Sequence, residues 1–593
     1  MHLSSMVKPS PSPPTKALTN GGIYLFVEDE SHWRDDSNVM LKESDDYTQQ
    51  TTILEEGALM PGGALNLCSG EAMAVFVQYA AIGFLYGLFP GLEYPVFQQY
   101  LHLEGYQINS YGALVNIAWS FKIIFGVLSD CFPIFGYRRK PWIVLGWVIA
   151  LGSCLFMALR PFGAPYCNAS GNATIQEMCF DREKLALVPR DKINEAAQEQ
   201  ASVYILASVL ATVGYVMVNC VSDAMVVQYA QREPLATRGR IQTSIYVVRT
   251  ISGILSQLLV GLTLNGPEFG GSFNFSFSIN LIYGLTCAPC VLACVATVLW
   301  LREEKTEKVP FAKWARQFWT LLQKQVVWQI LAFRFLSNIF QNFSSTAISP
   351  MTSMWVKVEP LMFSMMQIVG SLLFSSILAV VGKYGLQWNW RWTIALATLG
   401  LVAIDSVVYF LAIWDICRNQ YFFTGVILAD EIPSGVRFIV SLFCAVEIAD
   451  LGNEGAVYGL VTSVSNLTNP VATALYKFVN SFFRITNADI ELDTTAVRWD
   501  VTYTFLIAYG MKIGSLGWLF LLPPQKAHLQ RLKRYGITSR VAAWVSFVMF
   551  FLLLGYSFTT NVLSIFQSTA CYRIAGGPGC NKKAATNTTV TGS

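Results

Sequence analysis

Charged residues are scarce in this chain of 593 residues, because Asp, Glu, Lys and Arg together make up only 13% of it. Soluble domains are about one quarter charged. Hydrophobic residues make up 53%, and the mean hydropathy is +0.43. The length alone would suggest several soluble domains, but so little charge excludes them. A net charge of +3 over such a length gives no indication of a nucleic-acid partner, and we expect none.

Residues suited to catalysis or metal binding are also few. The four histidines are scattered, at His2, His32, His102 and His528. The chain contains no His/Cys metal spacing, no G-x-S-x-G nucleophile turn and no G-x-x-x-x-G-K-[ST] phosphate loop. We therefore expect a protein that is not an enzyme, holds no cofactor or metal, and uses gradients rather than ATP for any transport.

The N-terminus lacks a basic stretch followed by an apolar one, so we expect no cleaved signal peptide. Its acidic content argues against a transit peptide. The PSPSPP run near residue 10 and the polar, acidic stretch 28–56 cannot bury a core. We expect residues 1–70 to be a disordered cytosolic segment.

Long apolar runs are abundant. The runs 72–92, 141–159, 201–222 and 541–566 contain no Asp, Glu, Lys or Arg, and a bilayer is crossed by about 20 helical residues. The sequence therefore predicts an all-α, multi-pass membrane protein. The predicted spans are 71–92, 109–129, 141–160, 201–224, 240–263, 277–301, 326–350, 361–382, 391–414, 431–450, 455–479, 501–523 and 541–566.

The distribution of Lys and Arg predicts the orientation. Cytosolic connections carry the excess of basic residues, and with a cytosolic N-terminus every strongly basic connection falls on that side. We call this side the basic face and the opposite side the outer face. The basic connections are 137–140, 232–240, 301–316, 382–391 and 526–534.

Sequons and cysteines agree with this orientation. Glycosylation sites and disulfides form on the outer side of secretory-route proteins. We expect the plasma membrane, with a vacuolar membrane as the alternative. The expected glycosylation sites are Asn168, Asn172, Asn274 and, if the thirteenth helix spans, Asn587; the expected disulfides are Cys167 with Cys179 and Cys571 with Cys580.

Charged hinges recur at the basic face. Asp130 is followed by Arg138 and Arg139, and the stretch 222–253 again places an acid, Asp223, before a basic turn. In the second half, the stretch 447–467 places acids at the inner end of the tenth predicted span and the start of the eleventh. Recurrence in both halves is typical of a transporter built from repeats. Ion pairs there would hold one conformation shut until they break. The predicted coupling and gating residues are Asp130, Arg138, Arg139, Asp223, Glu447, Asp450 and Glu454.

Three motifs carry a family resemblance. Gly126, Asp130, Gly136, Arg138 and Arg139 resemble the major facilitator signature G-x-x-x-D…G-x-R-R, here with an insertion. The expanded form SD-x-x-P-I-x-GYRR-x-P is similar to that of the folate-biopterin transporter family. So are D-A-x-x-V-x-x-A-x-x-E-P-x-x-x-R-G-x-x-Q from Asp223 and EG-x-x-Y-x-L-x-TS-x-x-NL from Glu454.

The resemblance implies a major facilitator fold of two six-helix halves, to which this chain adds a thirteenth helix. The long acidic N-terminus, the enlarged loop 160–200 and that helix depart from the family pattern. The expected parts are the segment 1–70, a bundle 71–302, a linker 303–325, a bundle 326–523, a basic loop 524–540, the helix 541–566 and an extracellular tail 567–593.

Ionisable residues at membrane depth are rare and usually functional. We predict that Lys122, Arg249 and Arg334 bind an anionic substrate, since Arg presents a fork suited to carboxylates. The alternative is structural ion pairing with Asp223, Glu447 or Asp450. Trp119 and Tyr246 would stack on a flat ring, with ordinary packing as their alternative.

Together these features, with the resemblance, predict a secondary carrier of folate or biopterin that works by alternating access. Its coupling ion would be a proton or another ion, and desolvated carboxylates such as Asp223 and Glu447 would carry the proton. One alternative is a carrier of another metabolite such as S-adenosylmethionine, although its positive charge suits the basic set poorly. The other is a receptor or scaffold that retains the fold without transport.

Overall fold

The computed structural model describes residues 63–168, 175, 178–179, 188–194, 196–234, 240–305, 310–384, 388–428, 431–448 and 454–580. The chain divides into two units, Met1–Glu55 and Glu56–Ser593. All described residues belong to the second unit, so most of the predicted disordered segment 1–70 lies outside them. Within the described ranges the structure is helical, with isolated β-bridges and no named strand.

The first group of helices runs from α2 to α9. In it α2 packs against α8 and α9, and α5 packs against α7 and α9. The second predicted span is a continuous but irregular helix that changes from α3 to η2 to α4. The elements are α2 (Gly70–Gly91), η1 (Glu93–Tyr100), α3 (Gly105–Ile117), η2 (Ala118–Phe121), α4 (Lys122–Cys131), α5 (Lys140–Leu159), α7 (Ala197–Gln231), α8 (Arg240–Thr263) and α9 (Ile279–Trp300).

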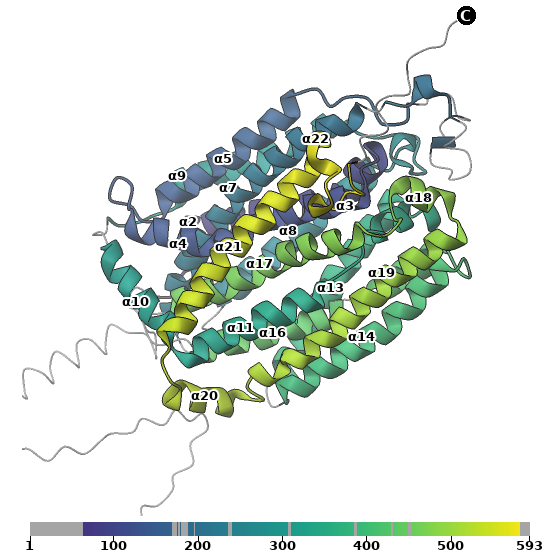
Figure 1. Cartoon of the computed structure of the whole chain (residues 1–593). Helices are drawn as coiled ribbons and strands as arrows, with labels where there is room; N and C mark the ends of the chain where they lie inside the picture. Colours follow the sequence, from purple (N-terminus) through teal and green to yellow (C-terminus); the bar gives the residue numbers. More distant parts are fainter. Residues whose placement is uncertain are drawn as a thin grey trace, which may run out of the picture. The chain divides into compact units, whose positions relative to one another are not determined.

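The second group runs from α11 to η9. Here α11 packs against α17 and η9, and α13 and α14 both pack against α16 (Figure 1). The elements are α11 (Gln325–Gln341), α12 (Ile348–Pro350), η6 (Met351–Trp355), α13 (Pro360–Tyr384), α14 (Trp390–Ile413), α15 (Gln420–Ile427), α16 (Glu431–Ile448), α17 (Glu454–Asn480), α18 (Asn487–Leu492), α19 (Thr495–Gly514) and η9 (Ser515–Leu521).

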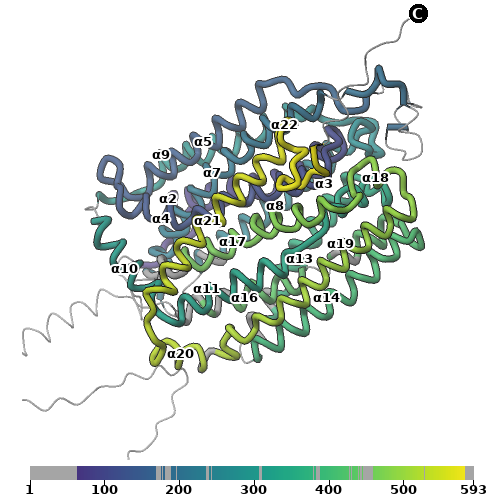
Figure 2. Tube along the Cα trace, viewed as in Figure 1, coloured from purple at the N-terminus to yellow at the C-terminus, as the bar shows by residue number. Residues whose placement is uncertain are grey.

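The longer helices outside these two groups are α10 (Phe311–Gln323), α20 (Lys526–Tyr535) and α21 (Arg540–Ile565). The helix α21 contacts α3 of the first group, α11 and α17 of the second, and α10. Figure 2 shows its yellow tube running beside α17 and meeting α10 near its start. The thirteenth helix therefore packs against both groups instead of standing apart.

The fold prediction is confirmed. Within the described ranges, ten helices are long and apolar enough to cross a membrane, and α21 is among them. Each of the thirteen predicted spans overlaps a helix, including α11 with 17 residues and α16 with 18.

One predicted span is wrong in detail. The span 326–350 is not continuous, because α11 ends at Gln341 and helix resumes only at Ile348. Hydroxyl and amide side chains compete with the helical backbone bonds here. Ser345 Oγ accepts from Ala347 N at 3.2 Å and bonds Thr504 Oγ1 at 2.8 Å, while Asn342 Nδ2 donates to Thr468 Oγ1.

Candidate substrate-binding site

The irregular second span brings a lysine to a carboxylate in the first group. The 3₁₀ turn η2 carries Trp119, and Lys122 begins α4 directly after it. Lys122 Nζ lies 3.1 Å from Asp223 Oδ2 on α7, with the two side chains 12% and 26% exposed. The alternative that the sequence left open, ion pairing of Lys122 with Asp223, is thus the arrangement in the structure.

Two neutral donors complete the surroundings of Asp223. Tyr79 on α2 donates its hydroxyl hydrogen to Asp223 Oδ1 at 2.6 Å, and Asn219 Nδ2 donates to the same oxygen at 3.1 Å. The carboxylate therefore accepts from α2, α4 and α7 together. Hydrogen bonds to an ionised acceptor are about twice as strong as neutral ones, so this acid ties three helices to one point.

Arg249 lies beside this cluster because α2 and α8 approach closely. A Cβ at Gly83 would lie 2.1 Å from the Arg249 carbonyl oxygen, so only glycine permits this helix separation. The Arg249 guanidinium lies 4.7 Å from the ring centroid of Tyr86 and 5.3 Å from that of Trp119. Lys122 Nζ lies 5.0 Å from the Trp119 centroid.

Two cations and two aromatic faces thus meet at one place. Cation–π contacts stabilise a guanidinium without neutralising it. Among the residues that the structure describes, no carboxylate lies within ion-pair distance of Arg249. In the described part of the chain Arg249 therefore contacts aromatic faces, whereas Lys122 shares its charge with Asp223.

In the second group, Arg334 and Arg437 donate to hydroxyl groups. Arg334 on α11 is 8% exposed and donates from Nε to Ser465 Oγ at 2.6 Å. Arg437 on α16 donates to Ser337 Oγ at 2.9 Å and to Ser515 Oγ at 3.0 Å. Arg334 and Arg437 both line a small cavity of about 10 Å³.

Arg437 is a candidate site residue that sequence reasoning missed. In the sequence its charge only interrupts the apolar run of the tenth predicted span. The hydroxyl groups that hold it come from three other elements, α11, α14 and η9. Hydroxyl partners of this kind have no recognisable spacing in the sequence.

The other predicted site residues divide into three cases. Tyr246 lies on α8 one turn before Arg249 and is 40% exposed, so its ring is not enclosed with Trp119. Glu447 and Glu454 lie on α16 and α17, but their side chains are outside the described part of the chain. Asp450 is also outside the described residues.

The residues of the predicted charged hinge at the basic face form ion pairs with one another. Asp130 Oδ1 lies 3.1 Å from Arg138 Nη2 and 2.6 Å from Arg139 Nη2, and Arg139 also donates to Ser129 Oγ at 2.6 Å. These residues join the end of α4 to the start of α5. Both helices belong to the first group, so the hinge fixes the angle between neighbours within that group.

Two glutamates at this face were not predicted. Glu303 accepts from the backbone N–H groups of Arg138, Arg139 and Lys140 at 2.8–2.9 Å, at the start of α5. Glu233 accepts from the N–H groups of Arg240 and Ile241, both at 3.1 Å, at the start of α8. A carboxylate stabilises a helix N-terminus by bonding free N–H groups and opposing the helix dipole.

Glu233 could have been found from sequence, because it is the acid of the motif that runs from Asp223 to Gln242. Its capping role was not recognised, because Glu233 precedes the first residue of α8 by a whole basic connection. Glu303 follows α9 and stands 165 residues after Arg138, whose N–H it accepts. No local pattern connects the two segments.

The outer ends of the two helix groups are joined by hydrogen bonds. Tyr94 OH donates to the Val358 carbonyl, and Gln98 Nε2 donates to Ser353 Oγ at 2.8 Å. Asn487 N donates to the Glu104 carboxylate at 2.8 Å. These contacts hold η1 and the start of α3 against segments near η6 and α18.

Closer to the ion pair, α17 packs against the second span. Ser463 Oγ accepts from Ile123 N at 3.1 Å, and Asn466 Nδ2 donates to the Trp119 carbonyl at 3.2 Å. Asn466 is the asparagine of the Asn-Leu pair that ends the motif beginning at Glu454. That side chain positions the turn that carries Trp119.

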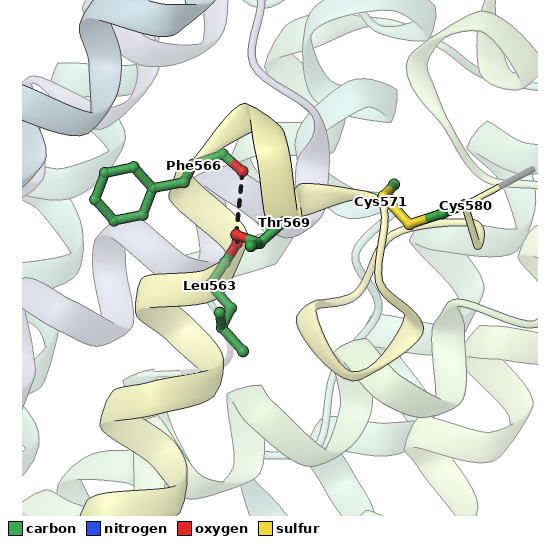
Figure 3. Close-up of a disulfide and its surroundings, with 5 residues drawn as sticks. All are labelled: Leu563, Phe566, Thr569, Cys571 and Cys580. Atoms are coloured by element: carbon green, nitrogen blue, oxygen red, sulfur yellow. Dashed lines mark hydrogen bonds between the residues drawn. A yellow bond between two sulfur atoms is a disulfide. The ribbon is translucent and has the colours of Figure 1, made fainter. Parts of the chain in front are cut away.

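The outer segments contain the disulfides Cys167–Cys179 and Cys571–Cys580, with Cα–Cα distances of 5.8 and 5.1 Å. Figure 3 shows the second one, directly after α22 (Gln567–Ala570), where Thr569 Oγ1 donates to the Leu563 carbonyl at 2.6 Å. Of the predicted glycosylation sites, Asn168 and Asn274 are exposed. Asn172 and Asn587 lie outside the described residues.

Comparison with known proteins gives matches to transporters. The model of the BT1 family matches residues 83–168. A protein of Synechocystis sp. named folate-biopterin transporter is 22% identical over 440 residues, which cover 72% of this chain and 78% of that protein. Folate transporter 1 of Plasmodium falciparum is 31% identical over 91 residues, 13% of this chain and 18% of its own length.

Among solved structures, the crystal structure of a D-xylose–proton symporter matches with a TM-score of 0.50 and 12% identity, covering 77% of this chain and 97% of that one. At this identity the match shows the fold alone. The resemblance to folate-biopterin transporters and the major facilitator fold are therefore confirmed, and the chain is a multi-pass membrane protein that resembles transporters.

Proposed function

We propose that this chain is a secondary carrier that moves folates or pterins across a membrane by alternating access. Support comes from the relatives, whose names include folate-biopterin transporter and folate transporter. The observation that carries the proposal is the position of Arg249, whose guanidinium lies over the rings of Tyr86 and Trp119 beside the Lys122–Asp223 pair.

This arrangement suits a flat, anionic substrate. The Arg249 guanidinium can bond a carboxylate through two parallel N–H groups, and folate carries carboxylates on its glutamate. The faces of Tyr86 and Trp119 offer stacking surfaces for a pterin ring. In the opposite group, Arg334 and Arg437 supply a second positive region for anionic groups of such a molecule.

Proton coupling would act through Asp223. A proton on this carboxylate would remove the negative charge that holds Lys122, because the ion pair of 3.1 Å needs the ionised form. Lys122 would then be available to the substrate anion as well as Arg249. Binding of the proton and of the anion would therefore favour each other, which is the requirement for a symporter.

Alternating access would open the outer face by breaking the contacts of Tyr94, Gln98 and Glu104 with the second group. In this proposal, the structure described above is a state closed at the outer face. The proposal further places the carrier in the plasma membrane, glycosylated on exposed outer asparagines such as Asn168 and Asn274.

The test is uptake of labelled folic acid and labelled biopterin into cells that lack their own carrier, at acidic and neutral external pH. Arg249→Ala is compared with Arg531→Ala, which removes an exposed arginine of α20. Surface expression of the two variants is matched. Saturable uptake that is greater at acidic pH, lost in Arg249→Ala and kept in Arg531→Ala would support the proposal.

The absence of uptake of both compounds, by protein that is shown to be at the cell surface, would overturn the substrate assignment. Uptake that is saturable but independent of pH would overturn the proton coupling and leave the carrier function in place. Equal uptake by both variants would remove Arg249 from the substrate path.

A further inference from the structure

A large apolar groove lies beside the second span, and none of its lining residues belongs to the charged site. It has a volume of about 870 Å³ and is lined by α4, α10, α11, α17 and α21. Every lining residue is apolar or a serine, with no charged residue among them. Pockets for small ligands are typically about 300–1,000 Å³, so this groove is large enough for a molecule rather than a few waters.

The groove lies at the membrane level of the basic face. It includes Leu128 and Phe132 at the end of α4, just before the basic connection 137–140, and Trp544 near the start of α21, just after the basic loop. Lining side chains of α21 such as Val545 and Phe551 are 56% and 45% exposed. In a bilayer these side chains face lipid, so the groove opens to the hydrocarbon of that leaflet.

The helix α10 forms one wall of this groove and carries basic residues outside the lining. Its side chains Trp314 and Phe318 line the groove, and Trp319 packs edge-on against Trp544 of α21 at a centroid distance of 4.8 Å. Lys313 and Arg316 of the same helix are exposed, and α10 contains no acidic residue. An apolar face with Trp, Phe and Leu and a basic polar face is typical of helices that lie in the membrane interface.

We propose that this groove binds an anionic glycerophospholipid of the leaflet at the basic face. Its acyl chains would fill the apolar groove between α4, α17 and α21, and its phosphate-bearing headgroup would contact Lys313 and Arg316 on α10. Clusters of basic residues next to membrane spans attract anionic lipids. A zwitterionic lipid of the same chain length would fill the groove without this attraction.

The position of the groove gives the lipid a mechanical role. One wall, α4, belongs to the first helix group, and two others, α11 and α17, belong to the second. A bound lipid would therefore contact both groups on the basic side of the Ile123–Ser463 contact. It stabilises the arrangement seen here, since any separation of α4 from α17 changes the shape of its site.

The probes are phosphatidylserine and phosphatidylcholine that carry the same photoreactive acyl chain. They are added to the purified full chain, and labelled peptides are identified by mass spectrometry. We expect the serine lipid to label peptides of α4, α10 or α21 in a saturable manner. Unlabelled phosphatidylserine should compete roughly tenfold better than unlabelled phosphatidylcholine, because only its net charge favours α10.

Two variants separate the headgroup from the chains. Lys313→Gln with Arg316→Gln should abolish the preference for phosphatidylserine, whereas the matched pair Arg531→Gln with Arg534→Gln on α20, also exposed basic residues, should keep it. Ala332→Trp places a large side chain in the groove and should reduce labelling by both probes. Unchanged thermal denaturation midpoints show that each variant is folded.

Equal labelling by both lipids that the α10 variant leaves unchanged would overturn the anionic preference. Labelled peptides confined to other helices would overturn the site itself. Competition by a sterol but not by phosphatidylserine would assign the groove to a different occupant and also overturn the proposal. None of these results depends on uptake of folate or pterin, so this inference and the proposed function can fail independently.

Discussion

Lys122 on α4 and Asp223 on α7 form an ion pair of 3.1 Å at membrane depth, and both side chains are largely shielded. Tyr79 and Asn219 bond the same carboxylate. A shielded pair of this kind adds little net stability, but the loss of one partner leaves the other charge uncompensated. The pair therefore makes the two residues dependent on each other.

This dependence predicts the outcome of a double-mutant cycle. Lys122→Met and Asp223→Asn should each lower the free energy of unfolding by about 3 kcal/mol, because each leaves a desolvated charge without its partner. The combined variant should recover most of that loss. Thermal denaturation of purified protein measures all three. Strictly additive losses would show that the two side chains do not interact.

A second prediction concerns the start of α5, where Glu303 accepts three backbone N–H groups. Glu303→Gln removes the charge that opposes the helix dipole and at least one acceptor. We expect a loss of about 1–2 kcal/mol in the free energy of unfolding. The neighbour Glu304 is exposed, and Glu304→Gln should change the midpoint little. Equal effects of the two substitutions would contradict the capping role.

The helices themselves were predictable because apolar runs of sufficient length have few alternatives in a membrane protein. The extra helix at 541–566 and the charged hinge at Asp130 were predicted from sequence, and the structure contains both. The break after Gln341 was not predicted. Apolar residues continue on both sides of Asn342 and Ser345, so the mean hydropathy of the run 326–350 does not mark a break there. Hydropathy averages do not register side chains that compete for backbone bonds.

The candidate site was only partly predictable. Lys122, Arg249 and Trp119 were predicted from their depth and residue type, and the structure brings them together with Asp223. Tyr86 was missed because an aromatic residue in an aromatic-rich chain has no distinguishing signal. Its role depends on the close approach of α2 and α8 at Gly83, which is a property of packing between distant segments.

Lys477 illustrates the same limit and gives a third prediction. It lies near the end of α17, is fully buried, and donates to Ser110 Oγ on α3 at 2.6 Å and to Asn561 Oδ1 on α21 at 2.8 Å. It also donates to Ser564 Oγ at 2.7 Å. One ammonium group therefore joins both helix groups to the thirteenth helix.

Removal of one acceptor should loosen this connection. Asn561→Leu leaves the buried ammonium group short of a partner, and we expect a loss of about 2 kcal/mol in the free energy of unfolding. Lys477→Met in the same chain should restore part of it. The control Thr559→Ala changes an exposed residue of α21 and should be neutral. A neutral Asn561→Leu variant would show that α21 is held by apolar packing alone.

The last prediction concerns two ionisable residues between the first two spans, His102 and Glu104. Burial raises the pKa of Glu104 to about 7, an effect that the N–H of Asn487 partly offsets and the charge of Asp489 strengthens. Burial lowers the pKa of His102 to about 4. The ring of His102 stacks on Tyr166 at a centroid distance of 4.8 Å.

The two shifts act in opposite directions on stability. The raised pKa of Glu104 means that the folded state holds its proton more firmly, so stability is highest below pH 4.5 and falls as the pH rises toward about 7. The lowered pKa of His102 means that stability is highest above pH 6.5 and falls as the pH drops toward about 4. Between these limits the two contributions oppose each other.

Single variants should therefore show the pH dependence of each residue, which largely cancels in the unaltered chain. On acidification from pH 7 to about pH 5, His102→Gln should become more stable and Glu104→Gln less stable, by up to roughly 1.4 kcal/mol per pH unit in the free energy of unfolding. Thermal denaturation across this range measures both, and the unaltered chain should change least of the three. Glu104 accepts a hydrogen bond from Asn487 across the two helix groups, so its pKa reports on the outer contact. If the stability of His102→Gln did not change with pH, the carboxyl of Glu104 would have an ordinary pKa.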